Sequence, residues 1–546
     1  MTTEQGFSEK IFENKKAFLL CFAAVMIFAL LLQLPFLSVP LERDEGEYAY
    51  IARLLLHGGV PYRDAFNQKP PVIFLLYGIS FLLFGESIEA IHLFKSLYTL
   101  VTLAAFYPLA RKFFSREVSL LAVAALAVLA SEPAFQANAA NTEIFLLLPM
   151  ILGFYLLFEF FKRGDILHLF LSGLAAGTAF MIKQVVLFPI LLMMIYLSHD
   201  VIKKKGPVLQ GLFIHFGIFA IGGGLPFFSL VLFFWRHGAL NDFWQCAFMH
   251  NFRYSRNIPL QYYLPVFQQI MGDRLLLPNI LLFFFMGIGL LFIVSGKRKG
   301  KERLFWVWFF LFSVPGVIVG GYFRPHYFIL LHPAMAILTA VGIVSAIKPM
   351  IHDLKMRAVW KNILYWIIVA GILGSPVYYA REIYFQRDPI LKSKAIYTTN
   401  PFTEALEIGR YLKDHTDPED SIFIFGSEPE MLFYAQRRST TRYIIFYPLL
   451  SGMKDSLEQQ KKAFQELSAS KPKYIVIVEI MESLQIHPNA EKFIMESVNR
   501  YLENYKIEGL VLYDKMGLWP TFYWGEEARA WEREPGRKNI RIYRRI

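Results

Sequence analysis

Residues 70–85 read PPVIFLLYGISFLLFG. A helix needs about 20 apolar residues to cross a bilayer, and a shorter run such as this one is typical of an interfacial or re-entrant helix. This run decides the topology of the chain, because it sets the side of a membrane on which every later loop lies.

The composition indicates a membrane protein. The chain has 546 residues, of which 55% are hydrophobic and 18% are charged, and its mean hydropathy is +0.39. Soluble domains carry about 25% charged residues, so a soluble globular protein of this length is excluded. The aromatic content of 16% excludes a disordered chain. Two cysteines, Cys21 and Cys246, are too few for a disulfide framework or a Cys-rich metal site.

Apolar runs of about the length of a membrane span occur in eleven other places. They lie near residues 17–38, 88–110, 117–134, 142–161, 166–182, 185–198, 208–234, 275–294, 304–321, 326–347 and 358–380. If residues 70–85 do not cross, the basic clusters all lie on one side, which the positive-inside rule assigns to the cytoplasm. These clusters are Lys15 and Lys16, Arg111 to Arg116, Lys162 and Arg163, residues 203–205, residues 297–303, and Lys348 to Lys361.

We therefore expect a polytopic α-helical protein of the plasma (inner) membrane with about eleven spans. Residues 70–85 lie flat in the outer leaflet, the N-terminus is cytoplasmic and the C-terminus is extracytoplasmic, that is, periplasmic. The net charge of +12 is then a topology signal and does not indicate nucleic acid.

The composition becomes that of a soluble protein from about residue 381. Short β-rich runs alternate with amphipathic stretches, which predicts an extracytoplasmic α/β domain over 381–546 after a membrane domain over 1–380. The β-rich runs are residues 421–426, 442–446, 473–479, 508–513 and 539–543, and the amphipathic stretches are 455–468 and 490–505.

The first outer loop is acidic and amphipathic. Asp44 and Glu45 precede apolar residues at helical spacing, which predicts a helix lying on the membrane with both acids at its start. The apolar positions are Tyr48, Ile51, Ala52, Leu55 and Leu56. Acids at a helix start are also ordinary caps, and this alternative stays open.

Other ionisable residues occur at the outer ends of predicted spans. Glu143 lies at the mouth of the fourth span and Lys183 at the end of the fifth. The turn at 320–327 contributes Arg324 and His326. Each also has an ordinary structural explanation: a helix cap, a snorkelling lysine or a contact with lipid headgroups. Together, two carboxylates and a cationic group should converge on one face of the bilayer.

These residue types suit group transfer. A carboxylate can remove a proton from a hydroxyl, and Lys and Arg can neutralise a departing phosphate. A proton-coupled transporter should instead carry ionisable groups near the membrane midplane, where Lys95 and Glu159 are the main cases here. The pattern therefore favours transfer from a lipid phosphate to a hydroxyl.

The same motifs resemble those of the GT-C glycosyltransferases that use polyprenyl-phosphate sugars. They are RDEGEYAYIAR at 43–53, QKPP at 68–71, NTEIF at 141–145, MIKQ at 181–184 and RPHY at 324–327. The chain is similar in particular to bacterial relatives of protein O-mannosyltransferases and of the lipid A aminoarabinose transferase. The resemblance covers roughly residues 15–350, and residues 422–443 look like the tail of bacterial members.

The resemblance implies a GT-C fold with residues 70–85 as a juxtamembrane helix. It implies that Asp44 is the catalytic base that activates the acceptor, and that Glu143, which stands where many members have an aspartate, is the second catalytic residue. The residues implied around the donor phosphate are Lys183, Arg324, His326, Tyr327 and Lys69, and those implied for the acceptor or the cavity are Glu45, Gln68 and His250.

Some members carry a metal, held by a glutamate before the Lys-Pro-Pro lysine and by a histidine in a later loop. Gln68 replaces that glutamate here, although His250 could match the histidine. A neutral amide is a poor ligand for a hard or borderline cation, so we expect no required cofactor, with a divalent metal near His250 as the alternative.

The sequence thus predicts an inverting glycosyltransferase that moves a sugar from a polyprenyl-phosphate donor to a hydroxyl of a lipid, glycan or protein at the outer face of the membrane. Its partners are the donor, the acceptor and membrane lipids, without nucleic acid. A transporter or flippase of lipid-linked sugars, with the acidic loop as a gate, is the alternative, and an inactive scaffold is a third reading. The sugar and the acceptor stay open.

Overall fold

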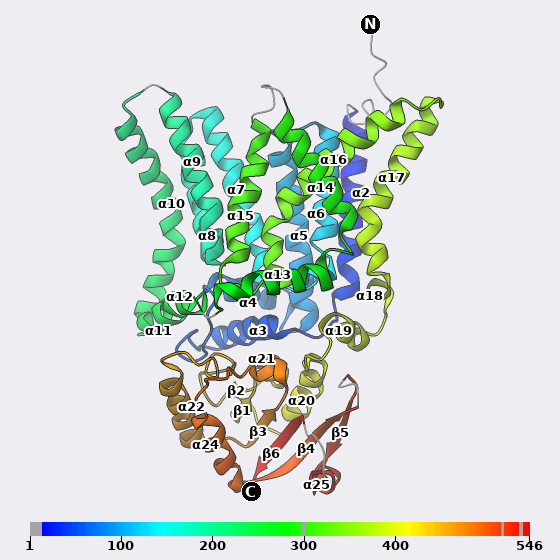
Figure 1. Cartoon of the computed structure of the whole chain (residues 1–546). Helices are drawn as coiled ribbons and strands as arrows, with labels where there is room; N and C mark the ends of the chain where they lie inside the picture. The colour runs from blue at the N-terminus through cyan, green and yellow to red at the C-terminus, as the bar shows by residue number, and fades with distance from the viewer. Residues whose placement is uncertain (1–13, 205, 257, 297–301, 515–517, 534–538) are drawn as a thin grey trace. The chain divides into compact units, whose positions relative to one another are not determined.

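The computed structural model describes residues 14–204, 206–256, 258–296, 302–514, 518–533 and 539–546 (Figure 1). The chain forms two compact units. Unit 1 comprises Met1–Leu37, Ile91–Leu232 and Asn251–Gln386, and unit 2 comprises Ser38–Ala90, Phe233–His250 and Arg387–Ile546. The predicted domain boundary near residue 380 stays a prediction.

Unit 1 is built mainly from helices at the eleven predicted apolar runs. They are α2 (Lys15–Gln33), α5 (Ile88–Arg111), α6 (Arg116–Leu129), α7 (Thr142–Arg163), α8 (Ile166–Phe180), α9 (Leu187–Lys203), α10 (Val208–Arg236), α14 (Ile280–Ser295), α15 (Leu304–Ile318), α16 (His332–His352) and α17 (Ala358–Tyr379). Figure 1 shows them side by side as a bundle. Shorter helices in the connections include α12 (Asn251–Tyr254), α13 (Tyr263–Ile270) and α18 (Arg381–Phe385).

Among the described residues, seven helices are long and apolar enough to cross a membrane. An eighth candidate is the pair of segments Leu260–Leu275 and Ile280–Ser295, which are bent by 115°. The predicted spans at 117–134, 166–182 and 304–321 correspond to shorter helices of 14, 15 and 15 residues. Helices α8 and α9 are separate, as predicted by the separate apolar runs at 166–182 and 185–198.

Small residues let several of these helices approach closely. A Cβ atom on Gly177 of α8 would overlap the backbone of Gly223 in α10, and one on Gly289 of α14 would overlap the backbone of Leu338 in α16. Close backbone contact of this kind is a common way to pack helices where burial of apolar surface gives no drive toward association.

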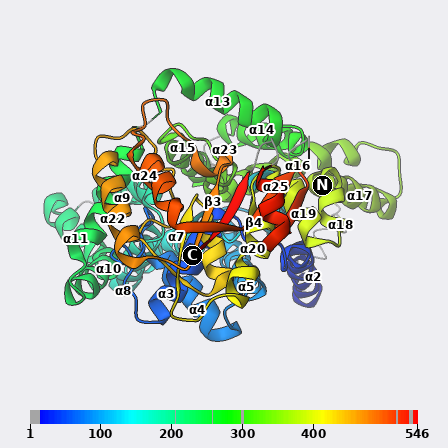
Figure 2. The same ribbon diagram turned by 90° about the horizontal axis from the view of Figure 1, so that it is seen from below.

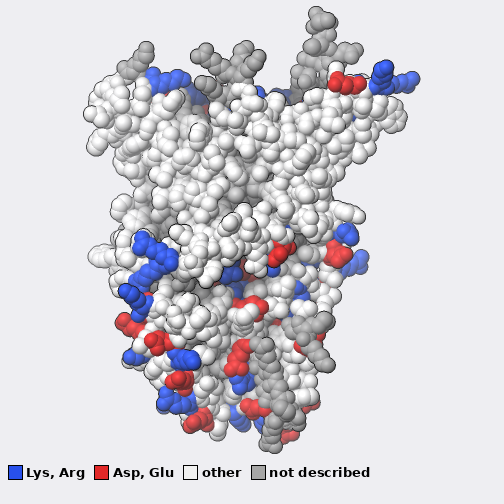
Figure 3. All heavy atoms as spheres, viewed as in Figure 1, with Lys and Arg blue, Asp and Glu red and all other residues white. Residues whose placement is uncertain are grey.

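The basic clusters of unit 1 lie together at one end of the bundle. Lys112 and Arg163 both form ion pairs with Glu159, and Lys348 forms one with Glu117 at 2.5 Å. In Figure 3, Lys and Arg appear at this end, and a broad band of the helices shows almost no charge. Lys205 and residues 297–301 lie outside the described residues. The side of the membrane that this end faces stays a prediction.

Unit 2 begins with two helices from the segment between α2 and α5, namely α3 (Arg43–Leu56) and α4 (Val72–Phe84), which lie side by side in Figure 1 and Figure 2. The ring of Tyr48 packs edge-on against that of Tyr77, with 5.6 Å between ring centroids. Helix α4 has 13 residues, so the apolar run at 70–85 forms a helix that is shorter than a membrane span.

Unit 2 also contains α11 (Leu240–Trp244) and the π-helix Gln245–His250, and its C-terminal part is the α/β region predicted from the composition. Six strands form one mixed sheet in the order β2-β1-β3-β6-β4-β5, with β2, β1 and β3 parallel and the other pairs antiparallel. The strands are β1 (Ser421–Phe425), β2 (Arg438–Ser439), β3 (Tyr474–Val478), β4 (Tyr505–Tyr513), β5 (Pro520–Trp524) and β6 (Ile540–Arg545). The main helices beside them are α19 (Pro389–Tyr397), α20 (Phe402–Asp414), α21 (Pro429–Ala435), α22 (Ser456–Ser470), α23 (Met481–Leu484), α24 (Phe493–Tyr501) and α25 (Gly525–Arg533).

One predicted strand was wrong, and two strands of the sheet, the two-residue β2 and β5, were not predicted. Residues 442–446 form no strand, because their apolar side chains are buried in an irregular segment whose Phe446 N–H donates to Ser427 Oγ at 2.9 Å. Strand β5 was missed because its short run begins with Pro520. Proline is tolerated there since β5 lies at the edge of the sheet.

Candidate active site

The neighbouring acids Asp44 and Glu45 in the first turn of α3 have different hydrogen-bond partners. Glu42 and Glu45 form a capping box, in which the Glu45 N–H donates to Glu42 Oε1 at 3.3 Å and the Glu42 N–H donates to Glu45 Oε2 at 3.1 Å. Such a box satisfies amide groups that have no partner within the helix. The cap expected as the ordinary alternative is therefore made by the Glu42 and Glu45 side chains, and the Asp44 carboxylate is not one of this pair.

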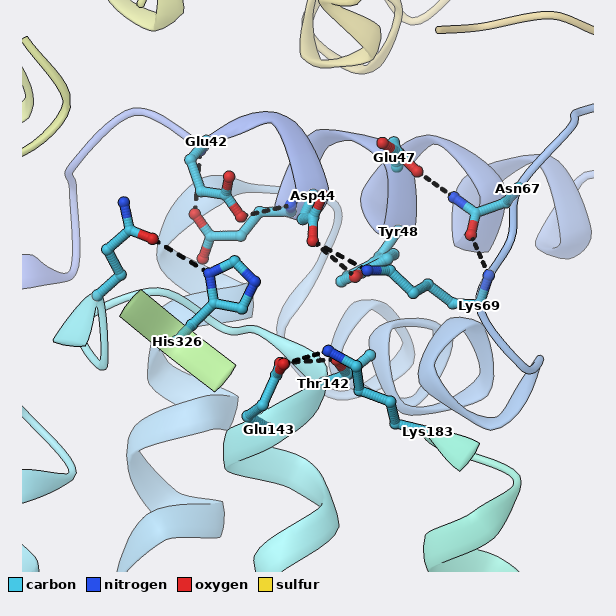
Figure 4. Close-up of polar contacts among 12 residues, drawn as sticks. Glu42, Asp44, Glu47, Tyr48, Asn67, Lys69, Thr142, Glu143, Lys183 and His326 are labelled. Atoms are coloured by element: carbon cyan, nitrogen blue, oxygen red, sulfur yellow. Dashed lines mark hydrogen bonds and ion pairs between the residues drawn. The ribbon is translucent and has the colours of Figure 1, made fainter. Parts of the chain in front are cut away.

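Asp44 instead faces a lysine and a tyrosine of unit 2 (Figure 4). Its Oδ2 atom accepts hydrogen bonds from Lys69 Nζ and from the Tyr48 hydroxyl, both at 3.2 Å. The Lys69 side chain is 9% exposed and that of Asp44 is 19% exposed. The partly buried carboxylate is therefore oriented by two donors but is still reached by solvent.

A second carboxyl, which was not among the predicted site residues, lies one turn further along α3. Glu47 is fully buried and accepts a hydrogen bond from Asn67 Nδ2, and Asn67 Oδ1 accepts one from the Lys69 N–H at 2.8 Å (Figure 4). Burial and the nearby charge of Asp44 raise the pKa of Glu47 to about 8. Glu47 is therefore mainly protonated at neutral pH. Its spacing of three residues from Asp44 places both on one helix face and could have identified it.

The two further candidates in unit 2 are buried. His250 ends the π-helix Gln245–His250, and its ring packs edge-on against Phe66 with 5.1 Å between centroids. Gln68 is 5% exposed. Phe66 and Gln68 flank Asn67 in the chain, so both candidates lie close to the segment that carries Lys69.

A second lysine–carboxylate pair lies in unit 1, at the end of the bundle away from the basic clusters. Lys183, between α8 and α9, donates to Glu143 in the first turn of α7 (Figure 4). The Thr142 hydroxyl donates to Glu143 Oε2 at 2.8 Å. The ring of Tyr327 lies 4.1 Å from Lys183 Nζ, a cation–π contact. The pair is nearly buried, with side-chain exposures of 11% for Lys183 and 2% for Glu143.

The turn that carries Tyr327 also places His326 and Arg324. His326 is buried, and its Nδ1 atom lies 3.1 Å from Gln136 Oε1. Arg324 is exposed and precedes the 3₁₀ helix Pro325–Leu331. The structure thus brings Glu143, Lys183 and Tyr327 together. The predicted convergence of these residues with Asp44 on one site stays a prediction.

Within the part of the chain that the structure describes, no group of three or more His, Cys, Asp or Glu side chains could hold a metal ion. The expected independence of a metal stays a prediction.

Comparison with solved structures identifies the fold. Three similar proteins are ArnT from Cupriavidus metallidurans bound to undecaprenyl phosphate, the oligosaccharyltransferase AglB from Archaeoglobus fulgidus in complex with an inhibitory peptide and a dolichol-phosphate, and the arabinofuranosyltransferase AftD from Mycobacteria. Their TM-scores are 0.57, 0.51 and 0.50, at 16%, 12% and 11% sequence identity. The matches cover 97%, 95% and 96% of this chain and 98%, 75% and 39% of those chains.

The class of protein follows from these matches. The chain is a multi-pass membrane protein with the GT-C fold of glycosyltransferases, which confirms the predicted fold class and the resemblance. The family model for dolichyl-phosphate-mannose-protein mannosyltransferase matches residues 68–221, a range that includes Lys69, Glu143 and Lys183. The family match and the fold together support a glycosyltransferase. No curated protein sequence matches the chain.

Proposed function

We propose that this chain is an inverting glycosyltransferase that moves a sugar from a polyprenyl-phosphate donor to a hydroxyl acceptor at the outer face of the plasma membrane. One observation carries the proposal: the Asp44 carboxylate accepts hydrogen bonds from Lys69 and Tyr48, whereas the capping box beside it is made by the side chains of Glu42 and Glu45. A carboxylate that is oriented by donors and reached by solvent suits a general base.

The donor class is supported by the fold neighbours. ArnT is described with undecaprenyl phosphate and AglB with a dolichol-phosphate, so two proteins of this fold bind a polyprenyl phosphate. In this chain the cationic Lys183 and the neighbouring Tyr327 are the proposed contacts for the donor phosphate, with Arg324, His326 and Lys69 as further candidates.

The proposed reaction is a single displacement. Asp44 removes the proton of the acceptor hydroxyl, and the hydroxyl oxygen forms a bond to the anomeric carbon of the sugar. The bond between that carbon and the phosphate oxygen breaks, and its electron pair leaves with the polyprenyl phosphate. Lys183 stabilises the departing negative charge, which lowers the barrier because the charge develops in the transition state. No metal is proposed, because Gln68 offers a neutral amide.

The test uses the full-length chain in proteoliposomes that contain labelled undecaprenyl-phosphate sugars and an extract of membrane lipids, glycans and proteins as the acceptor source. Asp44→Asn should lower transfer by about a hundredfold or more, because general bases contribute this much. It should still bind the donor, as measured by photocrosslinking of a labelled polyprenyl phosphate. Lys183→Met should instead lose crosslinking.

The controls separate the alternatives. Glu407→Gln, which alters an exposed carboxyl of α20, should retain full transfer. Full transfer by Asp44→Asn would contradict the role of Asp44. If the wild-type chain moves labelled donor between leaflets but transfers sugar to no acceptor, the flippase alternative is correct.

A further inference from the structure

The residue directly before Asp44 is held by the C-terminal part of unit 2. Arg43 is the first residue of α3, and its Nε–H donates to the backbone oxygen of Ser427 at 2.6 Å. Its terminal nitrogen lies 3.4 Å from Glu428 Oε1, and its guanidinium carbon lies 5.7 Å from the centroid of the Phe402 ring. The Arg43 side chain is 12% exposed.

Glu428 is itself fixed by a buried network. Its side chain is fully buried, and its Oε2 atom accepts a hydrogen bond from the Ser483 hydroxyl at 2.7 Å. Ser483 Oγ in turn accepts the Ser427 N–H at 3.0 Å. The groups that hold Arg43 therefore come from segments far from it in the sequence. Ser427 and Glu428 lie just after β1, and Ser483, which bonds to both, lies in α23.

The position of Arg43 in the first turn of α3 is unfavourable with respect to the helix dipole. The start of a helix carries partial positive charge, which disfavours a cation at this position. A buried carboxylate, by contrast, is stable only when it is paired and hydrogen-bonded. The pairing with Glu428 therefore explains why an arginine occupies the first turn beside the proposed base.

Other contacts hold the same turn. The Leu41 N–H donates to the Tyr434 hydroxyl at 2.8 Å. A Cβ atom on Gly46 would lie only 2.7 Å from the backbone nitrogen of Glu430. The residues before and after Asp44 are thus in direct contact with α21 or with the segment before it.

We propose that Glu428 is a positioning residue: by holding Arg43 it fixes the first turn of α3, so that the C-terminal α/β region determines the orientation of Asp44. This inference rests on the proposed function of Asp44 as the base. Glu428 acts through Arg43 and does not touch the substrate.

The test compares Glu428→Gln with Glu508→Gln in the full-length chain. Glu508 is a matched control, because it pairs with Arg529 at the same distance of 3.4 Å but belongs to β4, away from α3. Amide hydrogen exchange of residues 42–48 is measured together with transfer of the labelled sugars. Glu428→Gln should raise exchange in this segment and lower kcat at least about tenfold, with a donor KM within about twofold of the wild type. Glu508→Gln should change neither.

A pair of further variants separates positioning from general loss of structure. In the double variant Arg43→Gln with Glu428→Gln, neither a cation nor a carboxylate is left unpaired, so its kcat should be no lower than that of Glu428→Gln alone. Arg43→Lys keeps the charge but loses the fork that reaches both Ser427 and Glu428, so it should show an intermediate kcat. Arg43→Lys carries the test if Glu428→Gln does not fold.

The outcomes separate the two proposals. Unchanged exchange at 42–48 in Glu428→Gln, or unchanged kcat in a variant with raised exchange, would overturn the positioning role. If the wild-type chain transfers no sugar, or if Asp44→Asn transfers it fully, the proposed function fails, and the exchange data then report only on the structure of α3.

Discussion

Asp44 and Glu45 are adjacent carboxylates with different partners. Glu45 completes a capping box with Glu42, whereas Asp44 accepts hydrogen bonds from Tyr48 and Lys69. A helix start offers backbone donors to any nearby acid, so residue type alone does not separate the two tasks. The side-chain directions set by the first turn do separate them.

Glu47 gives a prediction about pH. Because its pKa in the folded protein is about 8, against 4.5 for an ordinary glutamate, the folded state binds the proton more tightly than the unfolded state. The Glu47 contribution to stability is therefore complete below about pH 4.5 and is lost as the pH rises to about 8. Glu47→Gln mimics the protonated acid, so the variant should match the wild type in melting temperature at pH 5 and exceed it at pH 9.

The measurement is thermal unfolding of the detergent-solubilised protein across this pH range. Glu407→Gln, at an exposed site, provides the baseline for loss of a carboxyl group. A constant difference between Glu47→Gln and the wild type at all pH values would contradict the raised pKa of Glu47.

At the scale of elements, the contact between α3 and α21 depends on a glycine. A Cβ atom at Gly46 would lie 2.7 Å from the Glu430 nitrogen and 2.9 Å from its Cα atom, so Gly46→Ala must push the two helices apart. Overpacking of this kind costs about 1–3 kcal/mol of unfolding free energy. We expect lower thermal stability and lower transfer activity, measured on the purified full-length chain.

Gly78→Ala is the matched control for this substitution. Gly78 lies inside α4 of the same unit, and a Cβ atom there would meet nothing within 4 Å. Alanine favours a helix over glycine by up to about 1 kcal/mol, so Gly78→Ala should be neutral or stabilising. Equal destabilisation by both substitutions would contradict the steric explanation for Gly46.

For the whole molecule, the charge pattern predicts that the N-terminus and the basic end of unit 1 face the cytoplasm, with the C-terminal α/β region outside. Asp353 and Asp417 suit a test, because their side chains are 84% and 85% exposed. With Cys21 and Cys246 replaced by serine, a membrane-impermeant maleimide should label Asp417→Cys in intact cells, and it should label Asp353→Cys only after the cells are permeabilised.

The labelling result bears directly on the number of spans. Labelling of Asp353→Cys but not of Asp417→Cys in intact cells would contradict the predicted orientation and, with a cytoplasmic N-terminus, the placement of residues 70–85 outside the set of spans. Labelling of both positions from the same side would mean that α17, which lies between them, does not cross the membrane. Labelling of Asp417→Cys in permeabilised cells verifies that the cysteine is reactive.

Much of the architecture could be predicted from hydropathy and charge. A membrane span needs a long apolar run, and basic residues concentrate in the loops on one side of the membrane. Both features are visible in the sequence, so the helices of unit 1 and the clustering of charge at one end could be predicted. The run at 442–446 shows the limit. Its apolar pattern was misleading because a buried irregular segment needs apolar side chains just as a buried strand does, so the pattern does not distinguish the two.

The sequence by itself determined that this chain is a multi-pass membrane protein with an α/β region, and it pointed to Asp44, Glu143 and Lys183, because charges among apolar runs are conspicuous. Only the tertiary structure decided which partners these groups have. It paired Asp44 with Lys69 and Lys183 with Glu143, added the buried Glu47 and placed Glu428 against Arg43. Arg43 and Glu428 are 385 positions apart, so no local pattern encodes their contact; it arises because folding buries both side chains at one place.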